Sequence, residues 1–543
     1  MTAGSAPDRV ADRLAAGLRA AGVRHAFGMP GGEVIAFIDA LERAGVRFVL
    51  ARHETAAAIM AAGASAAGGA PGVLVTTLGP GLANAINGVA DAWQERAPLL
   101  VISGVVDRAI RGRYTHQVVD HAALLRPLVK ASFEIEAENA EPVLARALRL
   151  ALAPPCGPVH CDLSPAVAET PAPAAPLPWP EPRALQPRID PSDPRIAGLR
   201  ARLQASRRPL IVAGYEAARG GAAAPLAALL SQRPIPVVTT YKAKGLVDDR
   251  LACSLGAAGL SPLADRILLD VVKRADLVIL LGYDPIEMRP GWLDAFMDPE
   301  QAVALGTGQD HAMHAAGMWI EGDPAALVAA LAEGASPGDG WPAGEPEAAR
   351  RRLDEAFAGP AAWGPHAVVE ILMQAAEAAD AIVTVDSGAH RILLSQMWKA
   401  SRPLALLQSA GWCTMGSALP LAIGAALEQP GRRVIAVLGD GGLEMSLGEL
   451  GTLRDAGLPV TVVVLQDRSL GLIELKQSAA GLARTGVRLG ETDYVAIARA
   501  FGGHAALCAD RGALRAALDD AASRPGFTLI ACTVEAQDYV DRI

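Results

Sequence analysis

The sequence predicts an α/β protein with three doubly wound, parallel-sheet domains. Short apolar runs rich in β-branched residues alternate along the chain with Ala- and Leu-rich stretches of helical spacing. The runs are apolar throughout, as expected for parallel strands that are covered on both faces. The chain of 543 residues is too long for a single core, and two Pro-rich stretches, at 169–194 and 334–351, divide it into three blocks.

The first predicted domain spans residues 1–168 and ends at a linker over 169–189. Each of its strands is followed by a turn signal or by a helical Ala-rich run, which is the pattern of βαβ units. Its strands are expected in RFVLARHE (47–54), in GVLVTTLGPGLAN (72–84), in APLLVISG (97–104) and in GPVHCDLS (157–164).

The second predicted domain spans 190–335, and a second linker, over 336–364, separates it from a third domain at 365–543. The second domain carries fewer Gly-rich turns than the other two. Its strands are expected in RPLIVAGY (208–215), IPVVTTY (235–241) and ADLVILLGYDP (275–285). Those of the third are expected in AIVTVDSG (381–388), LALLQSAG (404–411), RVIAVLGDG (433–441), PVTVVVLQD (459–467) and FTLIACTVE (527–535).

Two strands of the third domain end on aspartates that lie 27 residues apart, Asp440 and Asp467. The intervening stretch has helical spacing and stops at Gly457, so the segment forms a βαβ unit. A right-handed crossover brings the ends of both strands to one edge of the sheet, where open α/β sheets bind ligands. Two adjacent carboxylates repel unless a cation lies between them. The spacing therefore predicts a Mg²⁺ site and, with it, a phosphate-bearing ligand.

Composition excludes several other classes of protein. The net charge is −9 without a basic stripe, which argues against nucleic acid as a partner. The six cysteines form no CxxC pair, as expected of reduced intracellular thiols rather than a zinc site or disulfide frame. No signal-peptide pattern and no apolar run of about 18 residues occurs, so we expect a cytoplasmic protein without a membrane contact. No G-x-G-x-x-G opens the first βαβ unit, which argues against a nicotinamide dehydrogenase.

Three motifs taken together resemble those of the thiamine-diphosphate-dependent enzymes: RHE at 52–54, TLGPGLAN at 77–84, and GDGG at 439–442 with its downstream Gln-Asp. The resemblance covers about residues 8–535 and implies pyrimidine-binding, central and diphosphate-binding domains. It is nearest to the acetolactate synthase group, in GMPGGEVIAFIDAL (28–41), TTLGPGLANAINGVADAWQERAPLLVISG (76–104) and CTMGSALPLAIGAAL (413–427). THQVVDHAALLRPLVK (115–130) and GYDPIEMRPGW (282–292) look like the catabolic, flavin-independent branch.

The resemblance implies a role for each matching residue. Asp440, Asp467 and the carbonyl of Ser469 would hold Mg²⁺, and Glu54 would hydrogen-bond the aminopyrimidine of thiamine diphosphate. Gln117 and Lys130 would lie near the substrate as catalytic groups, although a solvated lysine is an equally good interpretation of Lys130. The remaining expected cofactor contacts are Pro30, Gly31, Asn84, Ser387, Ala389, His390, Cys413, Met415, Gly441, Gly442 and Leu470.

The implied activity is decarboxylation of a 2-oxo acid, with pyruvate as the favoured donor, followed by ligation to a second 2-oxo acid. Two alternatives stay open: a decarboxylase or lyase for another 2-oxo acid or a 2-hydroxyacyl-CoA, and a non-catalytic regulatory homologue. Trp412, Glu474 and Lys476 depart from the family pattern and bear on the choice of substrate. The family also implies a homo-oligomer, dimer or tetramer, with sites between subunits. Bound FAD is not expected, because segment 255–285 lacks the His-Gly element of flavin-binding relatives.

Overall fold

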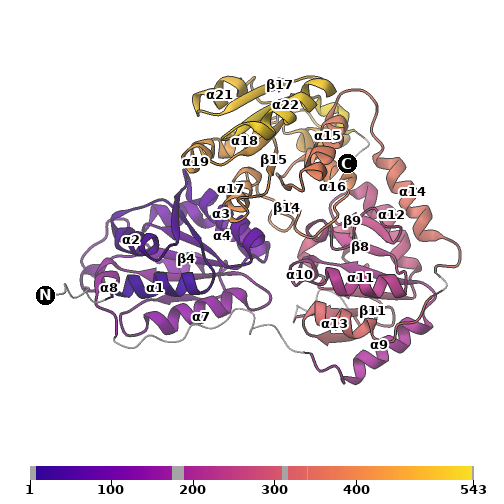
Figure 1. Ribbon diagram of the computed structural model, residues 1–543, viewed down its shortest axis with the longest axis horizontal. Helices are drawn as coiled ribbons and strands as arrows, with labels where there is room; N and C mark the ends of the chain where they lie inside the picture. The colour runs from indigo at the N-terminus through magenta and orange to yellow at the C-terminus, as the bar shows by residue number, and fades with distance from the viewer. Residues whose placement is uncertain (1–7, 174–188, 308–315, 339, 541–543) are drawn as a thin grey trace.

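The computed structural model describes residues 8–173, 189–307, 316–338 and 340–540, and contains three six-stranded parallel sheets (Figure 1). The N-terminal sheet has the order β2-β1-β3-β4-β6-β5 and is covered by helices on both faces. Its strands are β1 (His25–Gly28), β2 (Arg47–Leu50), β3 (Gly72–Thr76), β4 (Leu99–Gly104), β5 (Ser132–Glu134) and β6 (Pro158–Leu163). Its helices are α1 (Val10–Ala20), α2 (Ile35–Arg43), α3 (Glu54–Gly68), α4 (Pro80–Gln94), α5 (Arg108–Arg111), α6 (His121–Leu125), α7 (Ala140–Leu152) and α8 (Pro165–Glu169).

The central sheet has the order β12-β11-β10-β7-β8-β9. Its strands are β7 (Pro209–Ala213), β8 (Val237–Thr240), β9 (Ser254–Ala258), β10 (Leu277–Leu281), β11 (Ala302–Gly306) and β12 (Met318–Glu321). Its helices are α9 (Pro194–Ala205), α10 (Tyr215–Arg219), α11 (Ala223–Gln232), α12 (Pro262–Arg274) and α13 (Pro324–Ala332), and α14 (Glu345–Phe357) follows them.

The C-terminal sheet has the order β14-β13-β15-β16-β18-β17. Its strands are β13 (Ile382–Val385), β14 (Leu406–Gln408), β15 (Val434–Gly439), β16 (Val460–Gln466), β17 (His504–Cys508) and β18 (Thr528–Thr533). Its helices are α15 (Pro365–Ala378), α16 (Ala389–Met397), α17 (Ala418–Glu428), α18 (Asp440–Ser446), α19 (Glu449–Ala456), α20 (Gly471–Ala479), α21 (Tyr494–Ala500) and α22 (Arg511–Ser523).

The expected fold class is confirmed, and every predicted strand is present. The expected helix between the two aspartates is divided at 447–448 into α18 and α19, and α19 ends at Gly457 in the left-handed conformation. Met445, one of the apolar residues whose spacing in this stretch predicts a helix, is 63% exposed. Six strands lack a predicted counterpart (β1, β5, β9, β11, β12 and β17), because they are short, partly exposed or rich in Ala and Gly.

The expected linkers differ in outcome. Most of the first lies outside the described residues. The second, 336–364, contains helix α14, whose Leu353 and Phe357 are buried in the core cluster that also includes α12. The Gly- and Pro-rich residues lie before and after this helix. The expected linker thus contains a packed helix, whose apolar side chains lie in a cluster with residues of both the central and the C-terminal domain.

The N- and C-terminal domains share one hydrophobic cluster, which is centred on α3 and α17 (Figure 1). The helix backbones approach closely: a Cβ built on Gly63 would lie 2.5 Å from the Leu421 carbonyl oxygen, and one on Gly424 would lie 2.0 Å from that of Met60. Only glycine fits at such a contact. The two outer domains are thus packed as one unit. In the described part of the chain, no helix has the length and apolar character needed to span a bilayer.

Candidate functional site

The two strand-ending aspartates meet at one edge of the C-terminal sheet. β15 pairs with β16 in parallel, with Gly439 opposite Leu465, so Asp440 and Asp467 follow neighbouring strands. Asp440 accepts hydrogen bonds from the amides of Gly441 (2.9 Å) and Arg468 (2.6 Å). Burial raises the pKa of both carboxyls, and the negative charge of Asp440 contributes further to raising that of Asp467 to about 7. A cation would relieve this repulsion.

Ser469 and Leu470 follow Asp467 directly. The Ser469 amide donates to Oδ1 of Asp467 (3.0 Å), and its hydroxyl donates to the buried carboxylate of Glu474. The Leu470 amide donates to the carbonyl of Val487 (2.8 Å), which closes the loop against segment 484–490. The loop after Asp467 is therefore ordered by its own side chains and by the neighbouring segment.

A glycine-lined recess adjoins the aspartates. A Cβ built on Gly441 would meet the side chains of Leu470 (3.1 Å), Leu489 (3.3 Å) and Met415 (3.5 Å). One on Gly442 would lie 1.9 Å from Oδ2 of Asp386. A side chain is therefore excluded at Gly442 and would be tightly packed at Gly441, so glycine allows close approach of the backbone where α18 begins, at a helix end that favours an anionic group.

The DSGAH turn forms the other wall of this recess. Ala389 is the first residue of α16, and the imidazole of His390 lies against Gly388 and Gly439. Burial, with the charge of Arg391, lowers the pKa of His390 to about 3, so its ring is neutral. Its Nε2 is buried without a hydrogen-bond partner. A buried polar atom of this kind is normally satisfied, so a ligand atom is the natural partner here.

Loop 413–417 is held by two residues of that turn. Asp386 accepts the amides of Gly416 (3.0 Å) and Ser417 (2.8 Å), while the hydroxyl of Ser387 donates to the carbonyl of Cys413 (2.8 Å). The family resemblance implies that Cys413 contacts the cofactor. Within this chain, the carbonyl of Cys413 already accepts a hydrogen bond from Ser387. Asp386 has no role in the sequence-based prediction, although it too directly follows a strand.

Glu54 lies at the start of α3 and is 4% exposed. Its Oε2 accepts a hydrogen bond from Nδ2 of Asn84 (3.1 Å), and its Oε1 lies beside Gly81. Pro30 and Gly31 form the loop after β1 at the same edge. A Cβ on Gly31 would lie 2.2 Å from Oγ1 of Thr77, whose hydroxyl donates to Glu33 (2.6 Å). The structure thus brings Glu54, Asn84, Pro30 and Gly31 to one end of the N-terminal sheet.

The same end is tied to the C-terminal domain. Glu449, at the start of α19, accepts the backbone amides of Arg52 (3.0 Å) and His53 (3.1 Å), the two residues before Glu54. The side chain of Asn87 on α4 also donates to Thr414 (2.9 Å) and accepts from the indole of Trp412 (2.8 Å). These contacts fix both carboxyl edges relative to each other within one chain.

Three residues at or beside the predicted site have left-handed backbone conformations: Gln117 (φ 58°), Cys413 (φ 59°) and Arg468 (φ 55°). In the described part of the chain only three other non-glycine residues do so. Such conformations cost of order 1–3 kcal/mol each and gather at functional sites. Gln117 lies against the Gly79 turn, because a Cβ on Gly79 would be 2.3 Å from the Gln117 carbonyl oxygen.

Lys130 lies apart from this group. Its amide donates to the carbonyl of Pro158, the first residue of β6, and its Nζ donates to the carbonyls of Ala153 (2.6 Å) and Pro155 (3.0 Å). This is the amino edge of the parallel N-terminal sheet, whereas Glu54 follows the carboxyl end of β2. Within one chain Lys130 and Glu54 therefore lie at opposite edges of the sheet, and the expected place of Lys130 near the substrate stays a prediction.

The donor set fits a magnesium diphosphate. The two carboxylates at the shared edge provide hard oxygen ligands for the metal. The backbone at Gly441 and the unpartnered Nε2 of His390 provide contacts for the anion. Met415 supplies an apolar wall. The functional residues absent from the sequence-based prediction are Asp386 and Glu449. Asp386 could have been found by the pattern that identifies Asp440, because each is a carboxylate directly after a buried strand. Glu449 has no such signal.

Comparison with known proteins agrees with this geometry. Three family models match the chain: "Thiamine pyrophosphate enzyme, N-terminal TPP binding domain" at residues 8–124, "central domain" at 196–331, and "C-terminal TPP binding domain" at 386–532. Together they account for most of the chain.

Similar curated proteins cover almost the full length. An acetolactate synthase of Bacillus subtilis is 31% identical over 89% of this chain and 85% of its own. A catabolic acetolactate synthase of Raoultella terrigena is 28% identical over 97% and 95%. A probable acetolactate synthase large subunit of Methanocaldococcus jannaschii is 30% identical over 91% and 86%. The likeness thus extends over all three sheets.

Proposed function

Because this chain belongs to the thiamine pyrophosphate enzyme family, we propose that it decarboxylates a 2-oxo acid and ligates the remaining acyl unit to a second 2-oxo acid. Pyruvate is the favoured donor. The observation that carries the proposal is the joint presence of the Asp440–Asp467 edge and the buried Glu54–Asn84 pair, on the two domains that the family uses for its cofactor. The names of the relatives favour acetolactate as the product.

When bound, thiamine diphosphate would supply a nucleophilic thiazolium carbon for the substrate carbonyl and a cationic ring as the sink for the electron pair released with CO₂. The chain's residues prepare that chemistry. Glu54 would hold a proton at the aminopyrimidine N1′, with Asn84 fixing the orientation of its carboxylate. Met415 and Leu470 would shield the bound cofactor from water. Gln117, on the loop beside the Gly79 turn, would contact the substrate.

Mg²⁺ would be held by Asp440, Asp467 and the carbonyl of Ser469. The raised pKa values of the two aspartates support this, because both carboxylates are buried together and a divalent ion compensates their charge. Gly441, Gly442, Ser387, Ala389 and His390 would contact the diphosphate.

A homo-oligomer with shared sites is part of the proposal. Large apolar side chains are exposed around the C-terminal site: Trp412 (43%), Met445 (63%), Ile473 (44%) and Leu482 (64%). Exposed apolar side chains of this size support coverage by a second copy of the chain. The proposed compartment is the cytoplasm, because all six cysteines are free thiols.

A flavin is not part of the proposal. At the carboxyl ends of the central strands lies a cavity of about 280 Å³, at the lower limit of the roughly 300–1,000 Å³ of small-molecule sites. Two ion pairs line it, Lys242 with Glu95 and Arg96 with Asp284, each at 2.7 Å. The four residues of these pairs form part of the cavity wall.

The second candidate is a decarboxylase or lyase for a different 2-oxo acid or a 2-hydroxyacyl-CoA. The observation that favours it is the changed chemistry after the metal loop. Buried Glu474 pairs with Arg484 (3.1 Å) and Arg488 (3.2 Å), and Lys476 on the same helix is exposed. A non-catalytic homologue is disfavoured, because Glu54, Asp440 and Asp467 are all retained.

Product analysis tests the proposal. The protein is incubated with thiamine diphosphate, Mg²⁺ and pyruvate alone, and then with a panel of 2-oxo acids. Two pyruvates should yield one CO₂ and one acetolactate, whereas simple decarboxylation yields acetaldehyde. Absence of CO₂ release from every 2-oxo acid would reject the proposed function, and acetaldehyde as the sole product would favour the second candidate.

A further inference from the structure

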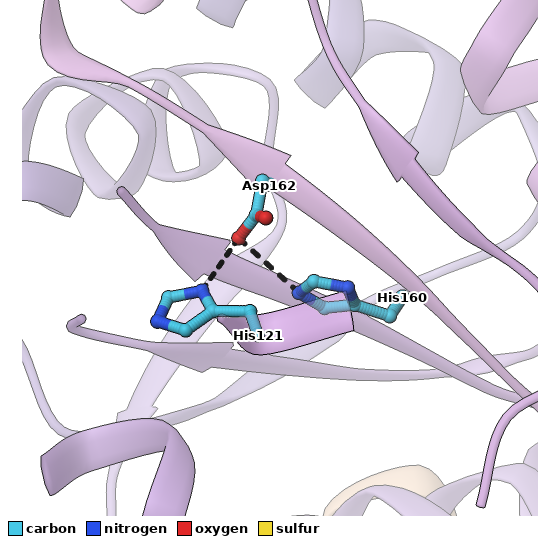
Figure 2. A group of neighbouring side chains, drawn as sticks. All are labelled: His121, His160 and Asp162. Atoms are coloured by element: carbon cyan, nitrogen blue, oxygen red, sulfur yellow. Dashed lines mark hydrogen bonds and ion pairs between the residues drawn. The ribbon is translucent and has the colours of Figure 1, made fainter. Parts of the chain in front are cut away.

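A cluster of two histidines and an aspartate lies beside the proposed site and has no role in it so far. His121 is the first residue of α6, and His160 and Asp162 both lie on β6 (Figure 2). Nδ1 of His121 is 2.7 Å from Oδ1 of Asp162, and Nε2 of His160 is 3.3 Å from the same oxygen. The imidazoles meet edge to face, with centroids 6.0 Å apart. The side chains of His121 and His160 are 2% and 0% exposed.

The hydrogen bonds fix the tautomer of His121. Its Nε2 accepts the backbone N–H of Gly79 (3.3 Å), so that nitrogen carries no proton. The proton therefore lies on Nδ1, which donates to Asp162. Burial raises the pKa of Asp162, but hydrogen bonds and charge from the two histidines outweigh it and bring the value down to about 2. The aspartate is thus an ionised acceptor that imposes the Nδ1–H form.

Donor atoms of these three residues lie within 4.8 Å of one another, as they would around a metal ion. The Gly79 contact opposes that interpretation. A metal on Nδ1 would leave the proton of a neutral imidazole on Nε2, where it would face the N–H of Gly79. Two donors would then point at each other. His160 packs edge to face against His121, and its Nε2 makes the longer contact, 3.3 Å, with the same oxygen of Asp162.

The Gly79 turn leads directly to the proposed catalytic carboxylate. Gly79 is the N-cap of α4, and its carbonyl accepts the amide of Ala83, one residue before Asn84. Asn84 in turn donates to Glu54. The carbonyl of Gln117 packs against the same glycine. A shift of Gly79 would therefore move both the residue that orients Glu54 and the loop that carries Gln117.

We propose that His121 is a positioning residue of this site: held as its Nδ1–H tautomer by Asp162, it fixes the amide of Gly79 and hence the start of α4. The inference rests on the proposed function for its kinetic test. Its other tests are independent of activity.

Two substitutions of His121 separate positioning from general stability. In His121→Asn, the amide nitrogen replaces Nδ1 and still reaches Asp162, but nothing reaches Gly79. In His121→Gln, the amide oxygen replaces Nε2 and accepts from Gly79, but Asp162 loses the hydrogen bond from residue 121. Each variant loses one buried hydrogen bond, so their melting temperatures should fall by similar amounts. His504→Asn, on β17 at the far edge of the C-terminal sheet, is the control.

The holoenzyme with thiamine diphosphate and Mg²⁺ supplies the kinetic readout. His121→Asn should lower kcat by about 10- to 100-fold with little change in KM, because misplacement of a catalytic group by about 1 Å costs of that order. His121→Gln should stay within about threefold of the parent by the same principle. Equal losses of kcat in the two variants would overturn the proposal.

Two readouts do not depend on turnover. Imidazole ¹⁵N NMR, assigned through the lost signal in His121→Asn, should show the Nδ1–H form, and hydrogen exchange of peptide 78–84 should quicken in His121→Asn only. An Nε2–H form, unchanged exchange, or stoichiometric zinc or iron that disappears in His121→Asn would each overturn the proposal. If the parent protein released no CO₂, the proposed function would fail, and these two readouts would still decide the role of His121.

Discussion

The side-chain amide of Asn84 donates to Oε2 of Glu54 at 3.1 Å, and this bond joins the first residue of α3 to the second turn of α4. Glu54 is 4% exposed, and its carboxylate is oriented by a residue 30 positions further along the chain. Its geometry therefore depends on where α4 begins, which is set at Gly79. Predictions about the proposed catalytic residue follow from this dependence.

Glu54→Gln should reduce turnover by about 10²- to 10⁴-fold, the usual contribution of a positioned acid or base. The amide keeps the shape of the side chain and an oxygen for Asn84, so folding and assembly should be unchanged. The measurement is kcat at saturating thiamine diphosphate and Mg²⁺, with Glu138→Gln, an exposed glutamate, as the control. Unchanged turnover would remove Glu54 from the mechanism.

Asp440→Ala should abolish Mg²⁺-dependent retention of thiamine diphosphate. The substitution removes one of two carboxylates at the shared sheet edge and the acceptor for the Arg468 amide. Retention is measured as cofactor bound after gel filtration with and without Mg²⁺. The exposed Asp519→Ala serves for comparison. Equal retention by Asp440→Ala and the parent would show that the metal is held elsewhere.

The buried carboxyl of Asp91, on α4, should make stability depend on pH. Burial and the nearby Glu95 raise the pKa of Asp91 from 3.8 to about 8. The folded protein therefore binds a proton that the unfolded chain releases, and the free energy of unfolding should fall as pH rises from about 4 to 8. Asp91→Asn keeps the acceptor for Ser409 (2.8 Å) and removes the titration. The difference in melting temperature between pH 5 and pH 8 should shrink in this variant; an identical pH slope would contradict the prediction.

Gly424→Ala should destabilise the contact between the outer domains. The added Cβ would lie 2.0 Å from the carbonyl oxygen of Met60, so α3 and α17 must separate. Overpacking of this kind costs about 1–3 kcal/mol of unfolding free energy, measurable by chemical denaturation. Gly431→Ala adds the same methyl group where no atom lies within 4 Å, and should change the free energy of unfolding little. Equal stability of the two variants would contradict the close packing.

The purified protein should carry no flavin, and added FAD should change neither its melting temperature nor its turnover. The reasons are the missing His-Gly element in segment 255–285 and the small volume, about 280 Å³, of the cavity at the central sheet. The visible absorption spectrum after gel filtration is the measurement. A stoichiometric yellow chromophore would be inconsistent with this prediction.

The strands and the metal edge could be predicted from sequence because they follow from local patterns. An apolar β-branched run defines a strand, and an aspartate after it lies at the carboxyl edge, as for Asp440 and Asp467. Asp386 satisfies the same rule. Helix α14 was obscured by the Pro- and Gly-rich residues that flank it, and β17, whose Leu507 is 62% exposed, lacks a buried run.

Contacts that depend on tertiary packing could not be predicted in this way. Glu449 reaches the amides of Arg52 and His53 across nearly 400 positions, and no local pattern signals such a bond. The left-handed backbones of Gln117 and Cys413 are imposed by neighbouring loops rather than by residue type. For Lys130, the motif indicated a role near the substrate, but it did not indicate at which edge of the sheet the residue lies.

The shared core of α3 and α17 affects how the protein is made. During synthesis the ribosome releases the N-terminal sheet hundreds of residues before α17 emerges, so the alanine-rich face of α3 stays exposed to water for most of translation. A fragment that stops after the first sheet would display the same face permanently. Expression of such fragments should therefore require a chaperone, or co-expression of the missing C-terminal segment.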